Sequence, residues 1–260
     1  MEKKEEKEAV LLFGVNPVRE KLRSSPEEVL QVLMVKGRHR PALRSIDEAA
    51  RRCGLPVHYV ESRVLDRLTK SRSHQGVAAK VGPHLHHSLD DLLRELSLSA
   101  RQDWILCLDG VTDPRNFGAI LRSAEAVGIH RIVIPKDRSV GVTPTVVRTS
   151  AGAVHYQKIY RVSNLRRALQ ELKGKGYWIV GLDVGAEEGI YGRVYPEKLV
   201  VVLGAEGTGI RPLIREECDF LVLIPMEGRV SSLNVAVAGG VFFYELLRQK
   251  GLGKNSRQNC

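Results

Sequence analysis

The chain has 260 residues, of which 43% are hydrophobic and 27% are charged, a composition typical of a soluble globular protein with one large or two modest domains. No apolar run approaches the length of a membrane span. The mixed-charge N-terminus lacks the apolar core of a signal peptide, so we expect a cytoplasmic protein. A net charge of +10 favours a polyanionic partner, because each neutralised phosphate releases condensed counterions.

The first part of the chain is typical of a small α/β domain, because short apolar strands alternate with amphipathic helices. We expect strands over residues 10–13, 29–35, 57–60 and 76–81, and helices over residues 16–22, 42–53 and 64–68.

The second part favours a larger α/β domain. Its strands are nearly continuous apolar runs, which indicates burial on both faces and hence a mostly parallel sheet between helix layers. The expected strands cover 104–108, 131–134, 177–182, 199–203 and 220–224, and the helices cover 117–127, 144–150, 165–173, 210–217 and 233–249.

These patterns predict five regions along the chain. They are a disordered leader (1–9), the small α/β domain (10–82), a linker with a short Leu-rich helix (83–102), the larger α/β domain (103–250) and a tail (251–260).

A basic segment lies in the first domain. Residues 36–72 contain ten Lys or Arg and four acidic residues, which gives a net charge of +6. A run of charges is more often only a solvent-exposed face, but this concentration of positive charge favours nucleic acid as a partner. We interpret this segment as a surface that contacts RNA or DNA, with Lys36, Arg38, Arg40, Arg44, Arg72 and the nearby His74 as candidate contacts.

The four cysteines, Cys53, Cys107, Cys218 and Cys260, form no CxxC pair and no spacing typical of zinc ligands. A reducing compartment fits these cysteines, and no metal is expected.

Polar clusters follow three of the strands in the second domain. They contain Asn116 with Arg122, Glu206 within the loop 204–209, and Ser232 with Asn234. Open α/β sheets bind ligands at the carboxyl ends of their strands, so we expect these side chains to line one crevice. They include no catalytic triad, and hydrolysis is therefore poorly supported.

Each cluster also has a purely structural explanation. Asn116 is a possible helix cap, Arg122 a surface cation, and Ser231 or Ser232 the N-cap of the last helix. A lone glycine-rich loop is weak evidence of a nucleotide site.

Three segments nevertheless resemble the motifs of the SpoU/TrmH methyltransferases, namely Asp113–Gly128, Val201–Ile210 and Ile224–Ala238. Two further segments, Phe13–Leu22 and Ser73–Ala78, resemble the substrate-binding domain of the subgroup that methylates 23S rRNA guanosine. The likeness extends from Leu12 to Arg248.

This resemblance implies S-adenosylmethionine as methyl donor and a ribose 2′-hydroxyl of RNA, most specifically 23S rRNA, as acceptor. It also implies an L30e-like N-terminal domain, a C-terminal SPOUT domain with a trefoil knot, and a homodimer whose active site lies at the subunit interface. The matching functional positions are Asn116, Arg122, Glu206, Ser232 and Asn234, and main-chain groups near Gly204, Ile224 and Leu233 would hold the cofactor.

In the family, the first-motif arginine is a proposed general base. Arginine has a pKa above 12, so a neutral guanidine at pH 7 would cost at least about 7 kcal/mol. We therefore expect a charged Arg122 that binds a target phosphate and stabilises the developing 2′-alkoxide, while an RNA phosphate or water accepts the proton.

Three other functions are compatible with these residues. A tRNA 2′-O-methyltransferase and an antibiotic-resistance rRNA methyltransferase share the motifs. A ribosome factor that binds RNA without catalysis would share the fold but need not bind the methyl donor.

Overall fold

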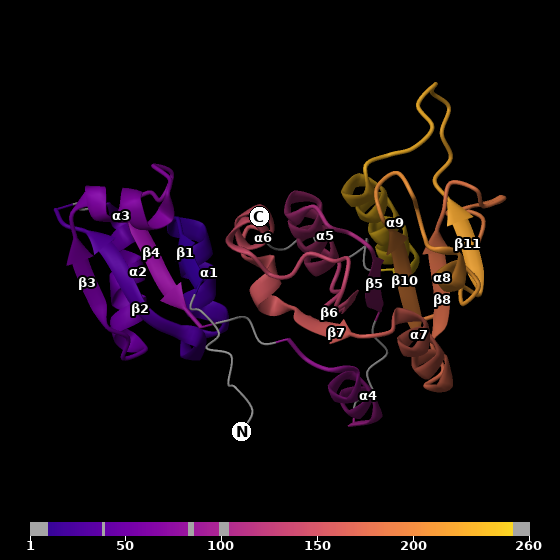
Figure 1. Cartoon of the computed structure of the whole chain (residues 1–260), viewed down its shortest axis with the longest axis horizontal. Helices are drawn as coiled ribbons and strands as arrows, with labels where there is room; N and C mark the ends of the chain where they lie inside the picture. Colours follow the sequence, from indigo (N-terminus) through magenta and orange to yellow (C-terminus); the bar gives the residue numbers. More distant parts are fainter. Residues whose placement is uncertain (1–9, 38–39, 83–85, 99–103, 252–260) are drawn as a thin grey trace. The chain divides into compact units, whose positions relative to one another are not determined.

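The computed structural model describes residues 10–37, 40–82, 86–98 and 104–251. The chain forms two compact units, Met1–Leu85 with Val142–Tyr156, and His86–Gly141 with Gln157–Cys260. Each unit has its own sheet (Figure 1). We call them the N-terminal unit and the sheet unit.

The N-terminal unit is built on a four-stranded mixed sheet with the strand order β1-β4-β2-β3. β4 is antiparallel to β1 and β2, and β2 is parallel to β3. All the strands and helices expected before residue 82 are confirmed to within a few residues. They are β1 (Val10–Phe13), α1 (Val15–Ser24), β2 (Val29–Val35), α2 (Pro41–Arg52), β3 (Val57–Val60), α3 (Ser62–Thr69) and β4 (Val77–Val81), with a 3-10 turn at Pro26–Glu28.

A segment from the middle of the chain completes this unit. It consists of α6 (Pro144–Thr149) and a 3-10 turn, η2 (Ala153–Tyr156), which pack on β1 and α1. The Arg148 guanidinium lies 5.3 Å from the centre of the Phe13 ring. The sequence patterns assign this segment to the region 103–250. The division of the chain into five regions stays a prediction.

The sheet unit contains seven strands in the order β7-β6-β5-β10-β8-β11-β9, and all neighbouring strands are parallel. The expected parallel α/β sheet is thus confirmed. The strands are β5 (Ile105–Asp109), β6 (Arg131–Pro135), β7 (Lys158–Val162), β8 (Trp178–Leu182), β9 (Glu188–Gly189), β10 (Leu199–Gly204) and β11 (Phe220–Leu223).

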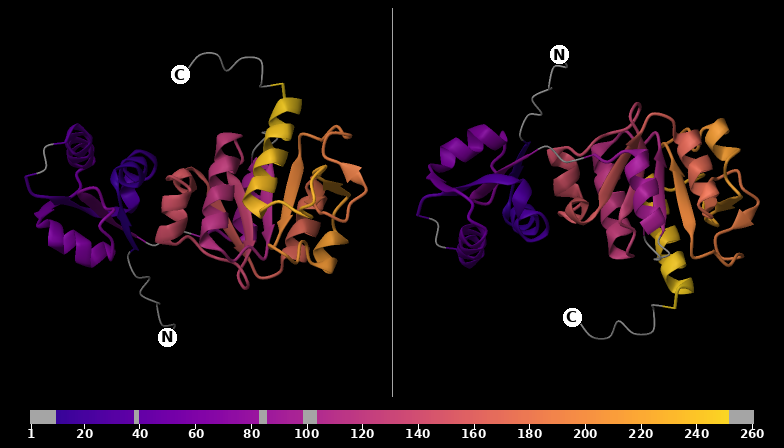
Figure 2. Two further views of the ribbon diagram at one scale, coloured as in Figure 1. Left: turned by 90° about the horizontal axis from the view of Figure 1, so that it is seen from above. Right: turned by 90° about the horizontal axis from the view of Figure 1, so that it is seen from below.

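Helices cover both faces of this sheet (Figure 2). One layer packs its leucines and alanines on the core that contains Ile105, Val200 and Val202. This layer consists of α4 (Leu89–Leu98), α7 (Leu165–Gly174) and α8 (Pro212–Arg215). The other layer pairs α5 (Pro114–Ala126) with α9 (Val235–Gln249).

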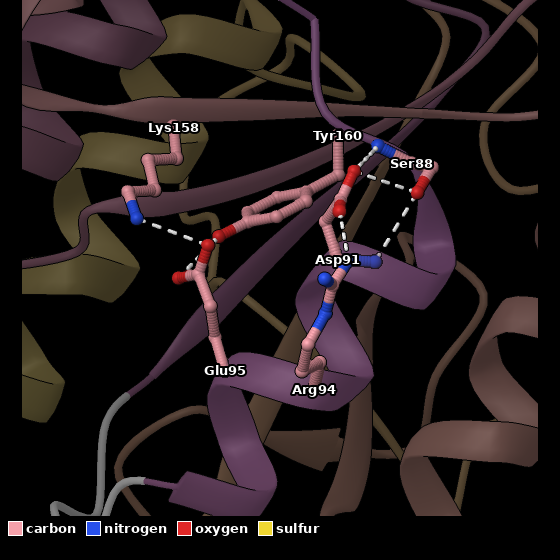
Figure 3. Close-up of polar contacts among 6 residues, drawn as sticks. All are labelled: Ser88, Asp91, Arg94, Glu95, Lys158 and Tyr160. Atoms are coloured by element: carbon pink, nitrogen blue, oxygen red, sulfur yellow. Dashed lines mark hydrogen bonds and ion pairs between the residues drawn. The ribbon is translucent and has the colours of Figure 1, made fainter.

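Helix α4 lies in the region expected to be a linker, and the structure shows what fixes it (Figure 3). Ser88 and Asp91 form a capping box, in which each side chain accepts a hydrogen bond from the other residue's backbone N–H. Glu95 accepts hydrogen bonds of 3.0 Å from Lys158 Nζ and from the Tyr160 hydroxyl on β7. The described part of this region is therefore a docked helix.

No helix in the described ranges is both long enough and apolar enough to cross a membrane. The trefoil knot that the resemblance implies stays a prediction.

Candidate functional site

Three side chains from the predicted clusters meet in one hydrogen-bonded triangle at the carboxyl edge of the sheet unit. Asn116 Nδ2 donates to Glu206 Oε2 at 2.8 Å. Asn234 Nδ2 donates to Asn116 Oδ1 at 3.0 Å and to Glu206 Oε1 at 3.2 Å. Glu206 and Asn234 are exposed and Asn116 is half-buried, so the triangle remains accessible to a ligand.

Asn116 is held in the first turn of α5. The helix begins at Pro114, and its N-cap is Asp113, whose carboxylate accepts a 2.6 Å hydrogen bond from the Arg115 backbone N–H. The alternative of Asn116 as the cap is therefore wrong. Its amide is free to face Glu206.

Asn234 has two functions in this geometry. Its Oδ1 accepts hydrogen bonds from the backbone N–H groups of Ala236 and Val237, which makes Asn234 the N-cap of α9, while its Nδ2 completes the triangle. The expectation that Ser231 or Ser232 caps this helix is wrong, because α9 begins two residues later than the sequence predicted.

Glu206 stands on a tight loop that follows β10. Ala205 and Gly209 exchange two backbone hydrogen bonds, so the loop folds back on the strand. A Cβ on Gly204 would lie 2.1 Å from the carbonyl carbon of Gly209, a distance that no side chain tolerates. Glycine at 204 is thus required for the close approach that positions Glu206.

An ion pair between an arginine and a buried carboxylate holds the end of this loop. Asp109, the fully buried last residue of β5, accepts hydrogen bonds from the backbone N–H and the Nε of Arg211, at 2.8 and 2.7 Å. Because β5 neighbours β10, this pair ties the Glu206 loop to the strand that leads to α5 and Asn116.

The other two predicted catalytic residues do not join the triangle. Arg122 is exposed on α5, and Ser232 is exposed in the loop before α9. Neither side chain has a hydrogen bond or ion pair with any residue that the structure describes. Glu206 pairs with the two amides and not with Arg122.

Among the described residues, no group of His, Cys, Asp and Glu is arranged to hold a metal ion. Cys107 and Cys218 are free thiols whose pKa values are raised by burial, that of Cys218 to about 12. They pack as small apolar side chains.

Two family models match the chain. The model of the SpoU rRNA methylase family matches residues 103–244, more than half of the chain. The model of the RNA 2′-O ribose methyltransferase substrate-binding domain matches residues 11–85. The chain belongs to the SpoU family. It is an RNA 2′-O-methyltransferase that uses S-adenosylmethionine.

Relatives of this SpoU protein match it along nearly its whole length. The 23S rRNA (guanosine-2′-O-)-methyltransferase RlmB of Xylella fastidiosa is 43% identical over 93% of this chain and 97% of its own. The RlmB of Shewanella oneidensis is 40% identical over 92% of this chain and 97% of its own.

Solved structures show the same fold. The SpoU methyltransferase AviRb from Streptomyces viridochromogenes, 24% identical, superposes with a TM-score of 0.79 over 94% of this chain and 91% of its own. A TrmH/SpoU tRNA-modifying enzyme of A. aeolicus, 31% identical, has a TM-score of 0.53 and covers 64% of this chain and 85% of its own. The SPOUT fold class is thereby confirmed.

The residues expected to hold S-adenosylmethionine in this SpoU protein fit that group. Gly204, Ile224 and Leu233 lie where β10 and β11 end and just before α9. Within the described chain, the main-chain groups of Ile224 and Leu233 make no hydrogen bond, so they are available to a ligand. The exposed side chains of Met226 and Leu233 offer apolar contacts beside them.

The predicted RNA contacts of the SpoU protein differ in accessibility. Lys36, Arg40, Arg44 and Arg72 are exposed, whereas Arg38 lies outside the described residues. His74 is only 2% exposed, donates from Nε2 to Asp66 and accepts the Gly76 N–H at Nδ1. Because both ring nitrogens of His74 are engaged internally, neither is available to contact RNA.

Proposed function

We propose that this protein methylates the 2′-hydroxyl of a guanosine ribose in 23S rRNA, in the cytoplasm. The observation that carries this proposal is the identity of 40% and 43% to two RlmB enzymes over more than 90% of the chain. The match includes the N-terminal unit, which the substrate-binding family model also covers.

A tRNA substrate is less well supported. The tRNA-modifying relative from A. aeolicus corresponds to only 64% of this chain. The SpoU methyltransferase AviRb shares the fold at 24% identity and carries no argument about substrate. A non-catalytic role is disfavoured, because Asn116, Glu206 and Asn234 form an ordered site.

In this proposal the triangle orients the target ribose. S-adenosylmethionine supplies the activated methyl group when bound. The carboxylate of Glu206 fixes both amides. The amide of Asn234 is then fully engaged, whereas Asn116 keeps one Nδ2 hydrogen that can donate to the ribose. The exposed hydroxyl of Ser232 lies on the same loop as Asn234 and contributes a further donor to the ribose.

Arg122 lies on a different face of α5 from Asn116, because six helical residues rotate a side chain by about 600°. Its role in the reaction therefore needs a separate explanation. We propose that its guanidinium completes the active site of a second subunit, where it binds the target phosphate and stabilises the developing 2′-alkoxide. The absence of a hydrogen bond or ion pair from Arg122 to any residue of the described chain supports this view.

An exposed apolar surface supports the homodimer that this requires. Every residue from Pro225 to Asn234 is exposed, and the loop extends away from the sheet (Figure 1). Val230, Val237 and Tyr244 are 68%, 52% and 57% exposed. Large apolar side chains that stay exposed on one loop and the helix after it are typical of an interface, and we propose that a second copy covers them.

Mapping of 2′-O-methyl groups in 23S rRNA tests the substrate. A strain that lacks the gene should lose one ribose methylation at a guanosine, and the restored gene should return it. Variants with Glu206→Gln should fail to return it. An unchanged 23S rRNA with a loss in tRNA would contradict the proposal.

A further inference from the structure

A cavity of the sheet unit opens at the carboxyl edge of the sheet, the edge that also carries the triangle. Its volume is about 640 Å³, and it is lined by Pro135 at the end of β6, by the start of α7 and by residues 211–214. None of the residues assigned above to catalysis or to the cofactor lines it.

Three arginines dominate its polar lining, namely Arg138, Arg166 and Arg211, against one carboxylate, Asp137. Two of them are held in place by carboxylates that do not line the cavity. Arg166 Nε donates to Glu217 at 2.7 Å, and Arg211 Nε donates to the fully buried Asp109 at 2.7 Å. In each of these two guanidiniums the Nη1 group has no hydrogen bond within the described chain, and it remains available as a donor.

Arg138 is exposed, and unlike the other two arginines it has no hydrogen bond or ion pair with any described residue. Its backbone has a φ of 54°, in the left-handed region that few residues other than glycine adopt. Such conformations concentrate at ligand sites, where the surrounding structure compensates their cost. Arg138 is therefore an unneutralised cation at the wall of the cavity.

The start of α7 adds backbone donors. Asn164 caps this ten-residue helix by accepting the Arg167 N–H at 3.1 Å. The N–H groups of Leu165 and Arg166, in the first turn, have no partner within the helix. Together with the helix dipole they favour an anion in the cavity.

The cavity is also connected to the methylation site. Arg211 is bound to Asp109, and Asp109 lies opposite Gly204 in the register of β5 and β10, two residues before Glu206. An RNA chain whose target ribose lies at the triangle and that continues along this edge of the sheet would bring a flanking phosphate to the cavity.

We propose that this cavity binds a backbone phosphate of the RNA next to the target nucleotide, through Arg138 and the Nη1 groups of Arg166 and Arg211. The guanidinium fork matches phosphate geometry better than any other side chain does. The inference rests on the proposed function, since it assumes that the target ribose lies at the triangle.

Arg138→Ala tests it, because this arginine supports no described contact of the fold. The KM for a 23S rRNA fragment should rise about tenfold, the loss expected for one hydrogen bond to a charged group. The slope of log affinity against log salt should fall by about one. Turnover, S-adenosylmethionine affinity and melting temperature should not change, and Arg138→Lys should restore the salt slope.

Arg167→Ala is the matched control. It removes the same charge from α7, but Arg167 is exposed, pairs with Glu171 and does not line the cavity. Equal KM values and salt slopes for the two variants would overturn the proposal, as would a loss of cofactor affinity in Arg138→Ala that matches its loss for RNA. Glu206→Gln separates the proposed methylation site from the proposed phosphate site. Full turnover in that variant contradicts the methylation site, independently of the result for Arg138→Ala.

Discussion

Glu206 accepts one hydrogen bond on each carboxylate oxygen, and both donors are side-chain amides. An amide in its place would present one NH₂ group to a donor, so one of the two contacts would become repulsive. The charge of Glu206 thus fixes which way Asn116 and Asn234 point.

Glu206→Gln should therefore lower turnover by about 10- to 100-fold, since a hydrogen bond to a charged group contributes about 1.5–3 kcal/mol. S-adenosylmethionine affinity should stay within a factor of a few, because the main chain of Ile224 and Leu233 is unchanged. Single-turnover methylation and calorimetric titration measure the two effects. Unchanged turnover would show that Glu206 has no role in the reaction.

Arg122→Ala should lose most of the turnover and keep cofactor affinity, because its guanidinium is expected to act on the RNA alone. Arg122→Lys keeps the charge but loses the bidentate fork, and it should stay well below the wild-type rate. Steady-state methylation of an rRNA fragment is the measurement. A near-full rate in Arg122→Lys would refute the bidentate contact.

At the scale of elements, the start of α9 joins the fold to the site. Asn234 caps the helix through Oδ1 and binds Asn116 and Glu206 through Nδ2. One side chain thereby couples the position of α9 to the catalytic triangle.

Asn234→Asp separates the two functions. The aspartate keeps the cap, which is worth about 1 kcal/mol, so the melting temperature should stay close to the wild-type value. It loses the Nδ2 donor and places a second carboxylate beside Glu206, so turnover should collapse. Asn234→Ala should lose both turnover and stability. Thermal unfolding beside an activity assay distinguishes these outcomes, and an active Asn234→Asp would contradict the triangle.

The sequence predicted those elements that carry a strong local pattern. The apolar run Leu199–Leu203 identified β10, whereas Lys158–Val162 was missed because two charged residues interrupt the apolar run of this edge strand. Ser231, Ser232 and Asn234 are all good caps, and only the actual helix start selects Asn234.

The site was predictable as a set of residues but not as a geometry. The family motifs pointed to Asn116, Glu206 and Asn234, yet the hydrogen bonds among them span 28, 90 and 118 residues. His74 was misjudged because it borders a basic segment, whereas its burial depends on contacts with Asp66 and Gly76.

For the whole molecule, a shared active site predicts complementation between two inactive variants. A mixture of Arg122→Ala and Glu206→Gln subunits should form mixed dimers in which one of the two sites is intact. Refolding them together should return about a quarter of wild-type activity, since half of the dimers are mixed. No recovery, with mixed dimers shown by mass spectrometry, would place Arg122 and Glu206 in the same subunit's site.

The N-terminal unit should contribute RNA affinity rather than chemistry. Replacing Lys36, Arg40 and Arg44 together by alanine should raise the KM for rRNA and reduce its salt dependence, with turnover and cofactor affinity unchanged. Point variants test this better than truncation, because deletion of β1 and α1 would uncover α6 and η2, which pack on them. An unchanged KM would show that this surface does not contact the rRNA.

The central place of β10 has a consequence for how the protein is made. This strand lies between β5 and β8, and both are synthesised before it. Until Gly204 leaves the ribosome, β5 and β8 each keep an unpaired strand edge, which invites wrong pairing. The β5–β10 ladder closes across about a hundred residues, so non-local pairing of this kind should make folding slow. An enzyme that acts on ribosomal RNA would thus complete its own sheet only when most of its chain has been translated.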